Sequence, residues 1–366
     1  MDGLESHLKA CDLFQFPDNM KAISFLTIED FNTTGLDGTT AEDGKRPPTT
    51  ELSNFYEFWW CEGASKKTGK EGGRWGLGKT TFHMASQLKS FWGLTVRQDD
   101  SRELLMGKAL LKSHRIDDIV YPYEGYFKSG EGFSPIIDKD IVQKFKQNFA
   151  ISRNNESGLS LVIPMPYNEI DSSSIVNYVI IHYAFAIFKG LLEVEIRREG
   201  ECLNLNAGNL VDIAYSRDWK NTAWENVNVK ELLQFLTDSI YNENIISLTV
   251  ADNEKPEITK DSFGDKIDEL KSSFNTGNLL SFKVPVVIKK INGTPSSTYF
   301  NIYLKKYPHL KQSEEFFVRS GITISDIKML GNCPLRMLFL AEDSTISEFL
   351  GDAETPAHTH WNERTV

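Results

Sequence analysis

The stretch "EGGRWGLGKTTFH", residues 71–83, matches two phosphate-binding patterns at once. Counted from Gly73, it fits G-x-x-x-x-G-K-T, the P-loop pattern of NTPases. Counted by its glycines, it reads G-x-x-G-x-G over residues 73–78 and leads into a helix pattern from Thr80. The two patterns need different structural settings, so the surrounding sequence decides between them.

Composition indicates an ordinary globular protein with room for two domains, because 366 residues exceed what one small core holds. The net charge of −11 argues against a large non-specific nucleic-acid surface, although a local DNA contact stays open. The four cysteines form no C-x-x-C pair, and His358 and His360 have no third ligand nearby, so we expect no protein metal cluster. The most apolar segment, residues 174–188, is shorter than the roughly 20 residues of a membrane span. We therefore expect a cytoplasmic protein that does not cross a membrane.

Hydrophobic patterns predict a mixed α+β protein. We expect strands over residues 22–30, 93–98, 102–111, 158–166, 191–198, 279–291, 297–307 and 314–324, followed by the apolar segment 334–343. We expect helices over residues 174–189 and 228–241, an amphipathic helix through Phe82, Ala85, Leu88 and Phe91, and a short aromatic helix or turn over residues 51–60. The predicted domains are residues 1–200, a linking helical region over 201–275, and a second α+β domain over 276–366.

The P-loop interpretation fits its surroundings poorly. A P-loop follows a buried strand, but "SKKTGKEG", residues 65–72, is polar and unsuited to a core. A P-loop enzyme also needs a later strand that ends in Asp to hold Mg²⁺, and neither "LVIPMP" nor "LLEVEIRR" ends that way. We therefore keep the P-loop NTPase only as an alternative.

The glycine-box interpretation finds each of its parts in order. The strand "LTIED" ends at Asp30, and a glycine turn follows between Gly35 and Gly38. A carboxylate at a strand end can accept a hydrogen bond from an adenine amino group, and glycines allow the backbone to approach the base. The amides of Gly76, Gly78 and Lys79 at a helix start can hold phosphates, with positive charge from Lys79 and Arg74.

Three blocks in this order resemble the GHKL ATPases, the family of gyrase, the ATP-driven heat-shock chaperone, histidine kinases and MutL. "TIEDFNTTGLDG" resembles the family's D-x-G-x-G motif, "GGRWGLGKTTF" its second glycine box, and "SGLSLVIPMP" its late G-T-x-x-x-x-x-P strand. The first-motif glycine is replaced near Asn32, and Leu159 stands where a hydroxyl residue is usual, with Ser160 next to it. The texture is closest to bacterial MutL-like and MORC-like ATPases linked to restriction or phage defence.

The resemblance implies a Bergerat-type α/β sandwich, followed by a transducer-like α+β domain, that binds ATP with Mg²⁺. The nucleotide-binding residues that it implies are Asp30, Gly35, Gly73, Arg74, Gly76, Leu77, Gly78, Lys79, Thr80 and Ser160. The residues that would sense the γ-phosphate from the second domain stay open among Arg319, Lys311 and the loop 351–361.

One family element is missing from the sequence. No E-x-x-x-N helix precedes the Asp30 strand, although its Glu activates water and its Asn holds Mg²⁺ in the family. We expect N-terminal truncation rather than decay, and we assign no catalytic residue. ATPase activity therefore depends on a helix supplied upstream.

Three functions follow as hypotheses. The first is an ATP-binding GHKL module whose lid closure and homodimerisation gate a partner such as a nuclease or helicase. The second is a P-loop NTPase that uses residues 73–80. The third is a GHKL-like scaffold that binds partners without nucleotide.

Overall fold

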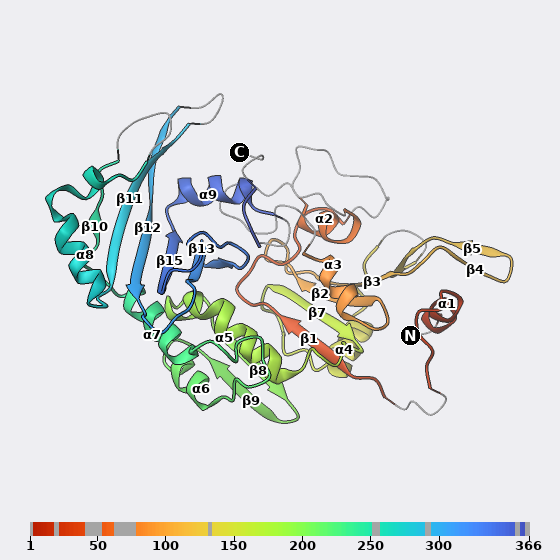
Figure 1. The fold of residues 1–366 in the computed structure, drawn as a ribbon. Helices are drawn as coiled ribbons and strands as arrows, with labels where there is room; N and C mark the ends of the chain where they lie inside the picture. The colour runs from red at the N-terminus through yellow and green to blue at the C-terminus, as the bar shows by residue number, and fades with distance from the viewer. Residues whose placement is uncertain are drawn as a thin grey trace. The chain divides into compact units, whose positions relative to one another are not determined.

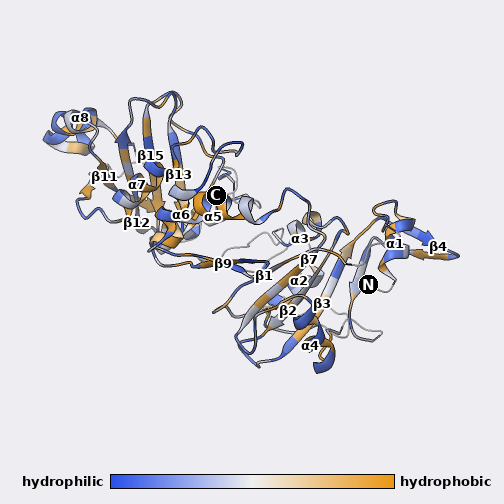
Figure 2. Ribbon diagram, turned by 90° about the horizontal axis from the view of Figure 1, so that it is seen from below, coloured by the Kyte–Doolittle hydropathy of each residue, from blue (hydrophilic) through white to orange (hydrophobic). Residues whose placement is uncertain are grey.

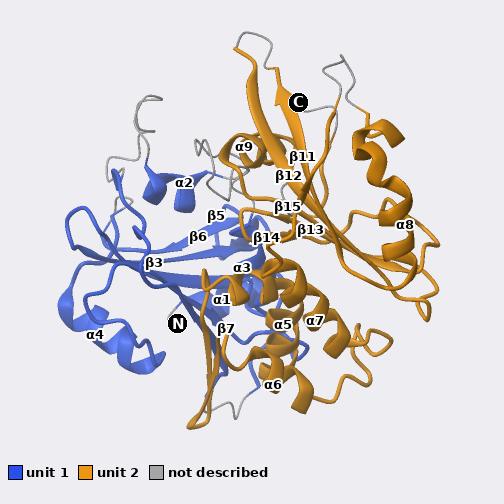
Figure 3. Ribbon diagram, turned by 90° about the vertical axis from the view of Figure 1, so that its left-hand side faces the viewer, with its two compact units in different colours: residues 1–66, 73–170 blue, residues 67–72, 171–366 orange. Residues whose placement is uncertain are grey.

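The computed structural model describes residues 3–17, 22–40, 53–61, 78–130, 134–250, 257–289, 294–355 and 359–362. The chain divides into two compact units (Figure 3). Unit 1 comprises Met1–Lys66 and Gly73–Ile170, and unit 2 comprises Lys67–Gly72 and Asp171–Val366. The division falls after Ile170, whereas the sequence analysis placed the end of the first domain at residue 200. Each unit combines helices with mainly antiparallel strands, so the predicted α+β class is confirmed.

Unit 1 is built on a five-stranded sheet in the order β1-β7-β2-β3-β6 (Figure 1). Its strands are β1 (Phe25–Glu29), β7 (Gly158–Pro164), β2 (Ser90–Val96), β3 (Glu103–Leu110) and β6 (Glu124–Phe127). Every neighbouring pair is antiparallel. β2 is central, and all seven of its residues are buried because helices cover both faces of the sheet.

Two apolar clusters hold helices against the two faces of this sheet. On one face, α2 (Asn54–Trp60) packs Phe55 and Trp59 against Phe91 of β2, and α3 (Thr80–Ala85) adds Phe82. On the other face, α4 (Lys139–Asn148) packs Val142 and Phe145 against Leu94 and its neighbours. Figure 2 shows both polar and apolar segments along α4, as expected for a helix with one buried stripe.

A hairpin extends unit 1 beyond the sheet. It consists of β4 (His114–Ile116) and β5 (Ile119–Tyr121), which pair antiparallel. The short helix α1 (Leu4–Ala10) packs beside β4. The sequence analysis predicted neither element, since both are too short to carry a clear period.

The amphipathic helix predicted through Phe82, Leu88 and Phe91 is wrong. α3 ends at Ala85, and Ser86 turns to extended geometry with φ −93° and ψ 133°. The Ser86 hydroxyl donates to Pro164 O at 2.6 Å and accepts from Leu88 N at 3.1 Å, which ties the turn to β7. The spacing of three residues therefore spans two elements, the short helix α3 and the strand β2. β2 is buried on both faces, so polar and apolar residues do not alternate along it.

Unit 2 contains a six-stranded sheet in the order β10-β11-β12-β15-β13-β14. Its strands are β10 (Ile246–Ser247), β11 (Leu280–Ile288), β12 (Ser296–Lys306), β13 (Glu314–Arg319), β14 (Ile322–Ile324) and β15 (Leu335–Ala341). β10–β11 and β13–β15 are parallel pairs, and the other pairs are antiparallel. The single strand expected over 314–324 is two strands, joined by a turn in which Ser320 and Gly321 both have positive φ.

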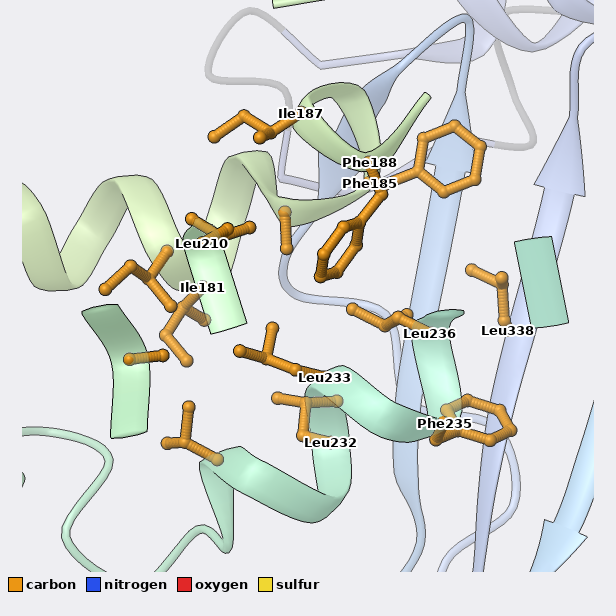
Figure 4. Packing of buried hydrophobic residues seen from close by; sticks show 14 of the residues in the cluster. Ile181, Phe185, Ile187, Phe188, Leu210, Leu232, Leu233, Phe235, Leu236 and Leu338 are labelled. Carbon is orange, nitrogen blue, oxygen red and sulfur yellow. The ribbon is translucent and has the colours of Figure 1, made fainter. Parts of the chain in front are cut away.

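The largest core lies in unit 2, where α5 (Ser172–Phe188) and α7 (Val229–Ile240) meet the sheet (Figure 4). Phe185 of α5, Leu236 of α7 and Leu338 of β15 belong to this cluster. The remaining elements are β8 (Val194–Arg198), β9 (Glu201–Leu205), α6 (Leu210–Ser216), the 3-10 helix Lys260–Lys266, α8 (Ile267–Asn275) and α9 (Ser344–Ala353). Among the described residues, no helix combines the length and the apolar character that a membrane crossing requires.

Candidate functional site

Two of the motifs from the sequence meet at one end of the unit 1 sheet. β1 pairs with β7 so that Glu29 lies opposite Ser160, and Asp30 follows directly. The Leu159 amide donates to Asp30 Oδ1 at 2.6 Å, and the Asp30 amide donates to Leu159 O at 3.0 Å. Residues 129 positions apart in the chain are thus hydrogen-bonded neighbours.

The Asp30 carboxylate is fixed through one oxygen only. Oδ1 accepts from the Leu159 amide and from the Thr33 hydroxyl at 3.0 Å. Within the described part of the chain, Oδ2 has no hydrogen-bond partner, and the side chain is 52% exposed. The group is therefore oriented by the protein while one oxygen can still accept a hydrogen bond from a ligand.

A buried arginine holds the two segments that carry this carboxylate and its partner Leu159. Arg153 donates to Ser160 Oγ at 2.9 Å, to Leu159 O at 3.1 Å, and to Asp30 O. Burial lowers the pKa of Arg153, and the carboxylates of Asp30 and Glu29 act in the opposite direction. A guanidinium stays cationic under such conditions, so it fixes the backbone of both strands with charge-assisted bonds.

Glu29 completes the support. Its carboxylate accepts from the Ser152 amide at 2.8 Å, the Ser152 hydroxyl at 2.7 Å and the Ser160 hydroxyl at 2.8 Å. Burial on its own would raise the pKa of Glu29, but the hydrogen bonds from Ser152, Ser160 and the Arg153 amide outweigh it and lower the pKa below its ordinary value. Glu29 is thus ionised at neutral pH and balances the buried arginine.

Glycine is required where the chain turns beside Asp30. Gly35 has φ 70°, and a Cβ there would lie 2.5 Å from Val96 O. The Thr95 hydroxyl anchors this turn, because it accepts from Leu36 N at 2.8 Å and donates to Gly158 O at 3.0 Å. A Cβ on Gly158 would lie 2.5 Å from Asp30 Oδ1, so a side chain at this position would displace the carboxylate.

Asn32 stands near the position where the resembling family has its first glycine. Its φ is 61°, in the left-handed region that Asn adopts more readily than most residues.

The second glycine box is described only from Gly78 onward. Gly73, Arg74, Gly76 and Leu77 lie outside the described residues, and their predicted contacts remain predictions. The Lys79 amino group donates to Glu57 O and Cys61 O at the end of α2. Lys79 would have to leave these carbonyls to reach a phosphate, and Thr80 is the first residue of α3.

Ser160 is buried, and its hydroxyl already has two partners. It donates to Glu29 Oε1 and accepts from Arg153 Nε. To contact a ligand, Ser160 would have to give up one of these bonds, so its present contacts are those of a supporting residue.

The candidates for a phosphate sensor in unit 2 differ in exposure. Arg319 is 1% exposed and donates from Nε to Glu354 Oε2 at 2.6 Å, which makes it part of an internal ion pair. Lys311 lies on the surface. The loop 351–361 is described except for residues 356–358.

No group of three or more His, Cys, Asp or Glu side chains placed to hold a metal ion occurs in the ranges that the structure describes.

The residues that support Asp30 carry little signal in the sequence. Arg153 and Ser152 lie in the polar loop "ISRNNESG", which carries no recognisable motif. Thr95 lies within an apolar strand and looks like a packing residue in the sequence. Only Glu29, directly before Asp30, could have been noticed as a second acid at the same strand end.

Comparison of the chain with protein-family models gave no match, and comparison with curated proteins gave none either.

Proposed function

We propose that unit 1 is an ATP-binding module of the GHKL type. The observation that carries the proposal is the hydrogen-bonded contact between Asp30, at the end of β1, and Leu159, at the start of β7. The sequence resemblance makes these two places parts of one adenine site, and they are adjacent across a strand pair. An antiparallel sheet with α2 and α3 on one face and α4 on the other agrees with an α/β sandwich.

The arrangement favours this proposal over the P-loop NTPase. A P-loop connects a strand of a parallel sheet to a helix. Here every pair in the unit 1 sheet is antiparallel, and in the described part of the chain the element that precedes α3 is the helix α2. The Lys79 amino group is also bonded to the carbonyl end of that helix.

The residues present fit an adenine base better than any other part of a nucleotide. Asp30 Oδ2 would accept a hydrogen bond from the exocyclic amino group, while Arg153 and Glu29 hold Asp30 in place. Gly35 and Gly158 allow the two segments beside Asp30 to pack closely, which holds the carboxylate in position for the base. Bound Mg²⁺ would neutralise the phosphates, and we assign no residue to it or to water activation.

The proposal for the whole chain follows the resemblance. Closure of the lid over ATP would promote homodimerisation, and unit 2 would act as a transducer toward a nuclease or helicase partner in restriction or phage defence. A cytoplasmic location belongs to the same proposal.

Substitution of Asp30 by Asn tests the proposal. Asn keeps an oxygen for the Leu159 amide, but its amide NH₂ faces the adenine amino group with a donor instead of an acceptor. We expect ATP binding, measured by calorimetry and by thermal shift, to weaken about 100-fold or more. Asp118→Asn, in the β4–β5 turn, is the matched control and should bind as the unmodified protein does.

Lys79→Ala separates the alternatives. Under the proposal it weakens ATP binding less than Asp30→Asn does, and under the P-loop hypothesis the order is reversed. Full ATP affinity in a folded Asp30→Asn protein would refute the adenine assignment. No stabilisation of the unmodified chain by ATP would favour the scaffold hypothesis.

A further inference from the structure

A second candidate site lies at the opposite end of the unit 1 sheet. There the structure contains a cavity of about 630 Å³, a volume within the range of small-molecule sites. Ser90, Ala109 and Gly125 contribute to its wall from β2, β3 and β6. β2 places Val96 beside Gly158 at the Asp30 end and Ser90 beside Ala109 at the cavity end. Ser90 and Val96 are six residues apart, about 20 Å along the strand, so the cavity and the candidate adenine site lie toward opposite ends of β2.

Several aromatic rings line the wall. Trp92, Phe145 and Phe149 line it, and the Trp92 and Phe149 rings stack with centroids 5.7 Å apart. Gly107 lets the Trp92 ring lie against β3, because a Cβ there would be 2.3 Å from Trp92 Cδ1. Such a wall favours a planar apolar ligand, which gains from burial and from ring stacking.

One buried polar atom in the wall lacks a partner. The Ser90 residue is 3% exposed, and its hydroxyl makes no hydrogen bond within the described residues. Buried hydroxyls are nearly always paired, because an unpaired one loses its bonds to water without compensation. The oxygen has almost no accessible surface, so a polar group on a ligand in the cavity would satisfy it once the Ser90 side chain rotates toward the cavity.

The two histidines at the cavity are hydrogen-bonded to each other. His114 Nδ1 lies 2.7 Å from Lys112 O, and since a carbonyl only accepts, this nitrogen carries a proton. His114 Nε2 lies 2.7 Å from His7 Nδ1, so one of these two nitrogens must accept. Burial, and secondarily His114, lowers the pKa of His7.

The charged side chains of the wall are matched to each other. Lys108 Nζ lies 2.8 Å from Glu124 Oε1. An ionic ligand would bury an additional charge without a counterion, at a high desolvation cost. A neutral ligand avoids that cost.

We infer that this cavity binds an uncharged, largely aromatic small molecule with a hydrogen-bonding group for the Ser90 hydroxyl. The inference does not depend on nucleotide binding at Asp30.

N-phenyl-1-naphthylamine is a suitable probe, because it is neutral and aromatic, carries one N–H donor, and fluoresces strongly in apolar surroundings. We expect the full chain to bind one equivalent saturably.

Gly125→Leu should weaken binding at least tenfold by filling the cavity. A Cβ at Gly125 meets only Ala109 Cβ at 3.9 Å, so the backbone tolerates the substitution. Ser90→Ala should weaken binding about 2- to 10-fold through the lost hydrogen bond. Val120→Leu on the exposed hairpin, and Asp30→Asn, should bind the probe as the unmodified protein does.

Three results would overturn the inference. One is the absence of saturable binding to the folded chain, and another is unchanged affinity in a folded Gly125→Leu protein. The third is equal affinity at the same site for the anionic probe 1-anilinonaphthalene-8-sulfonate, since this would contradict the neutral ligand class. If Gly125→Leu does not fold, Ala109→Leu on the facing strand provides the same test.

Discussion

The two ends of strand β2 differ in whether the buried polar groups nearby have hydrogen-bond partners. At the Val96 end, the buried Arg153 guanidinium, the Glu29 carboxylate and the Ser160 hydroxyl satisfy one another. At the Ser90 end, aromatic rings surround a cavity, and a buried hydroxyl has no partner in the described structure. The contrast indicates where each end could receive a ligand: an exposed, oriented carboxylate at the first end and an apolar cavity at the second.

The largest effect should come from Arg153→Met, which keeps the volume of the side chain and removes its charge. The change removes the positive charge near Glu29 and Asp30 and takes a donor from the carbonyl oxygens of Asp30 and Glu156. We expect the free energy of unfolding to fall by about 3–5 kcal/mol in urea denaturation. The control, Arg115→Met on the exposed hairpin, should change it by less than about 0.5 kcal/mol. An equally small change for Arg153→Met would show that the polar end is not the stabilised one.

The same substitution at both ends of the sheet sharpens the comparison. Ser160→Ala removes partners from Arg153 and Glu29, so it should cost about 1–3 kcal/mol in the free energy of unfolding. Ser90→Ala removes a hydroxyl that has no partner, so it should be neutral or slightly stabilising. A large loss of stability for Ser90→Ala would mean that the hydroxyl is already satisfied, and the two ends would then be alike.

Two glycines that line the cavity allow a matched comparison. The expected loss in the free energy of unfolding is similar to that of Ser160→Ala or smaller. Gly107→Ala places a methyl group against Trp92 and should cost about 1–3 kcal/mol through overpacking. Gly125→Ala meets only Ala109 and should leave stability within about 0.5 kcal/mol. Thermal denaturation of both variants measures the difference. Equal losses would mean that the Trp92 ring moves freely within the cavity.

The smallest effect concerns pH. The pKa of His7 is lowered from 6.5 in the fold, so the unfolded chain binds more protons below that value. The contribution of neutral His7 is therefore complete above pH 6.5 and is lost as pH falls toward the folded pKa. The difference in unfolding free energy between the unmodified protein and His7→Gln should shrink by less than about 1 kcal/mol between pH 7.5 and 5. A difference that grows over this range would contradict a lowered pKa of His7 in the fold.

The sequence predicted long elements well and short or doubly buried ones poorly. Helix α5 and strands β7, β11 and β12 were predicted, because their apolar runs are long and bounded by turn residues. The helix expected through Phe91 was wrong, since β2 is covered on both faces and lacks alternation. The hairpin β4–β5 and helix α1 were missed because three to seven residues carry too little pattern.

The candidate site was predictable only where a motif marked it. Asp30 and Gly35 stand in such a motif, and the pairing of β1 with β7 brings Asp30 to Leu159. Arg153 could not have been predicted, because its contacts with Asp30 and Ser160 form only when its loop has folded against β1 and β7. The cavity at Ser90 was equally hidden, since its wall comes from six separate segments of the chain.

The burial of β2 has a consequence for how the protein opens. β2 is hydrogen-bonded on both edges and covered on both faces, so no local fluctuation can expose its amides without removing helices from the sheet. Its amide protons should therefore exchange with deuterium only when unit 1 unfolds as a whole. A compound bound at either end would slow the exchange of these same amides, and hydrogen exchange along one strand could report occupancy at both ends.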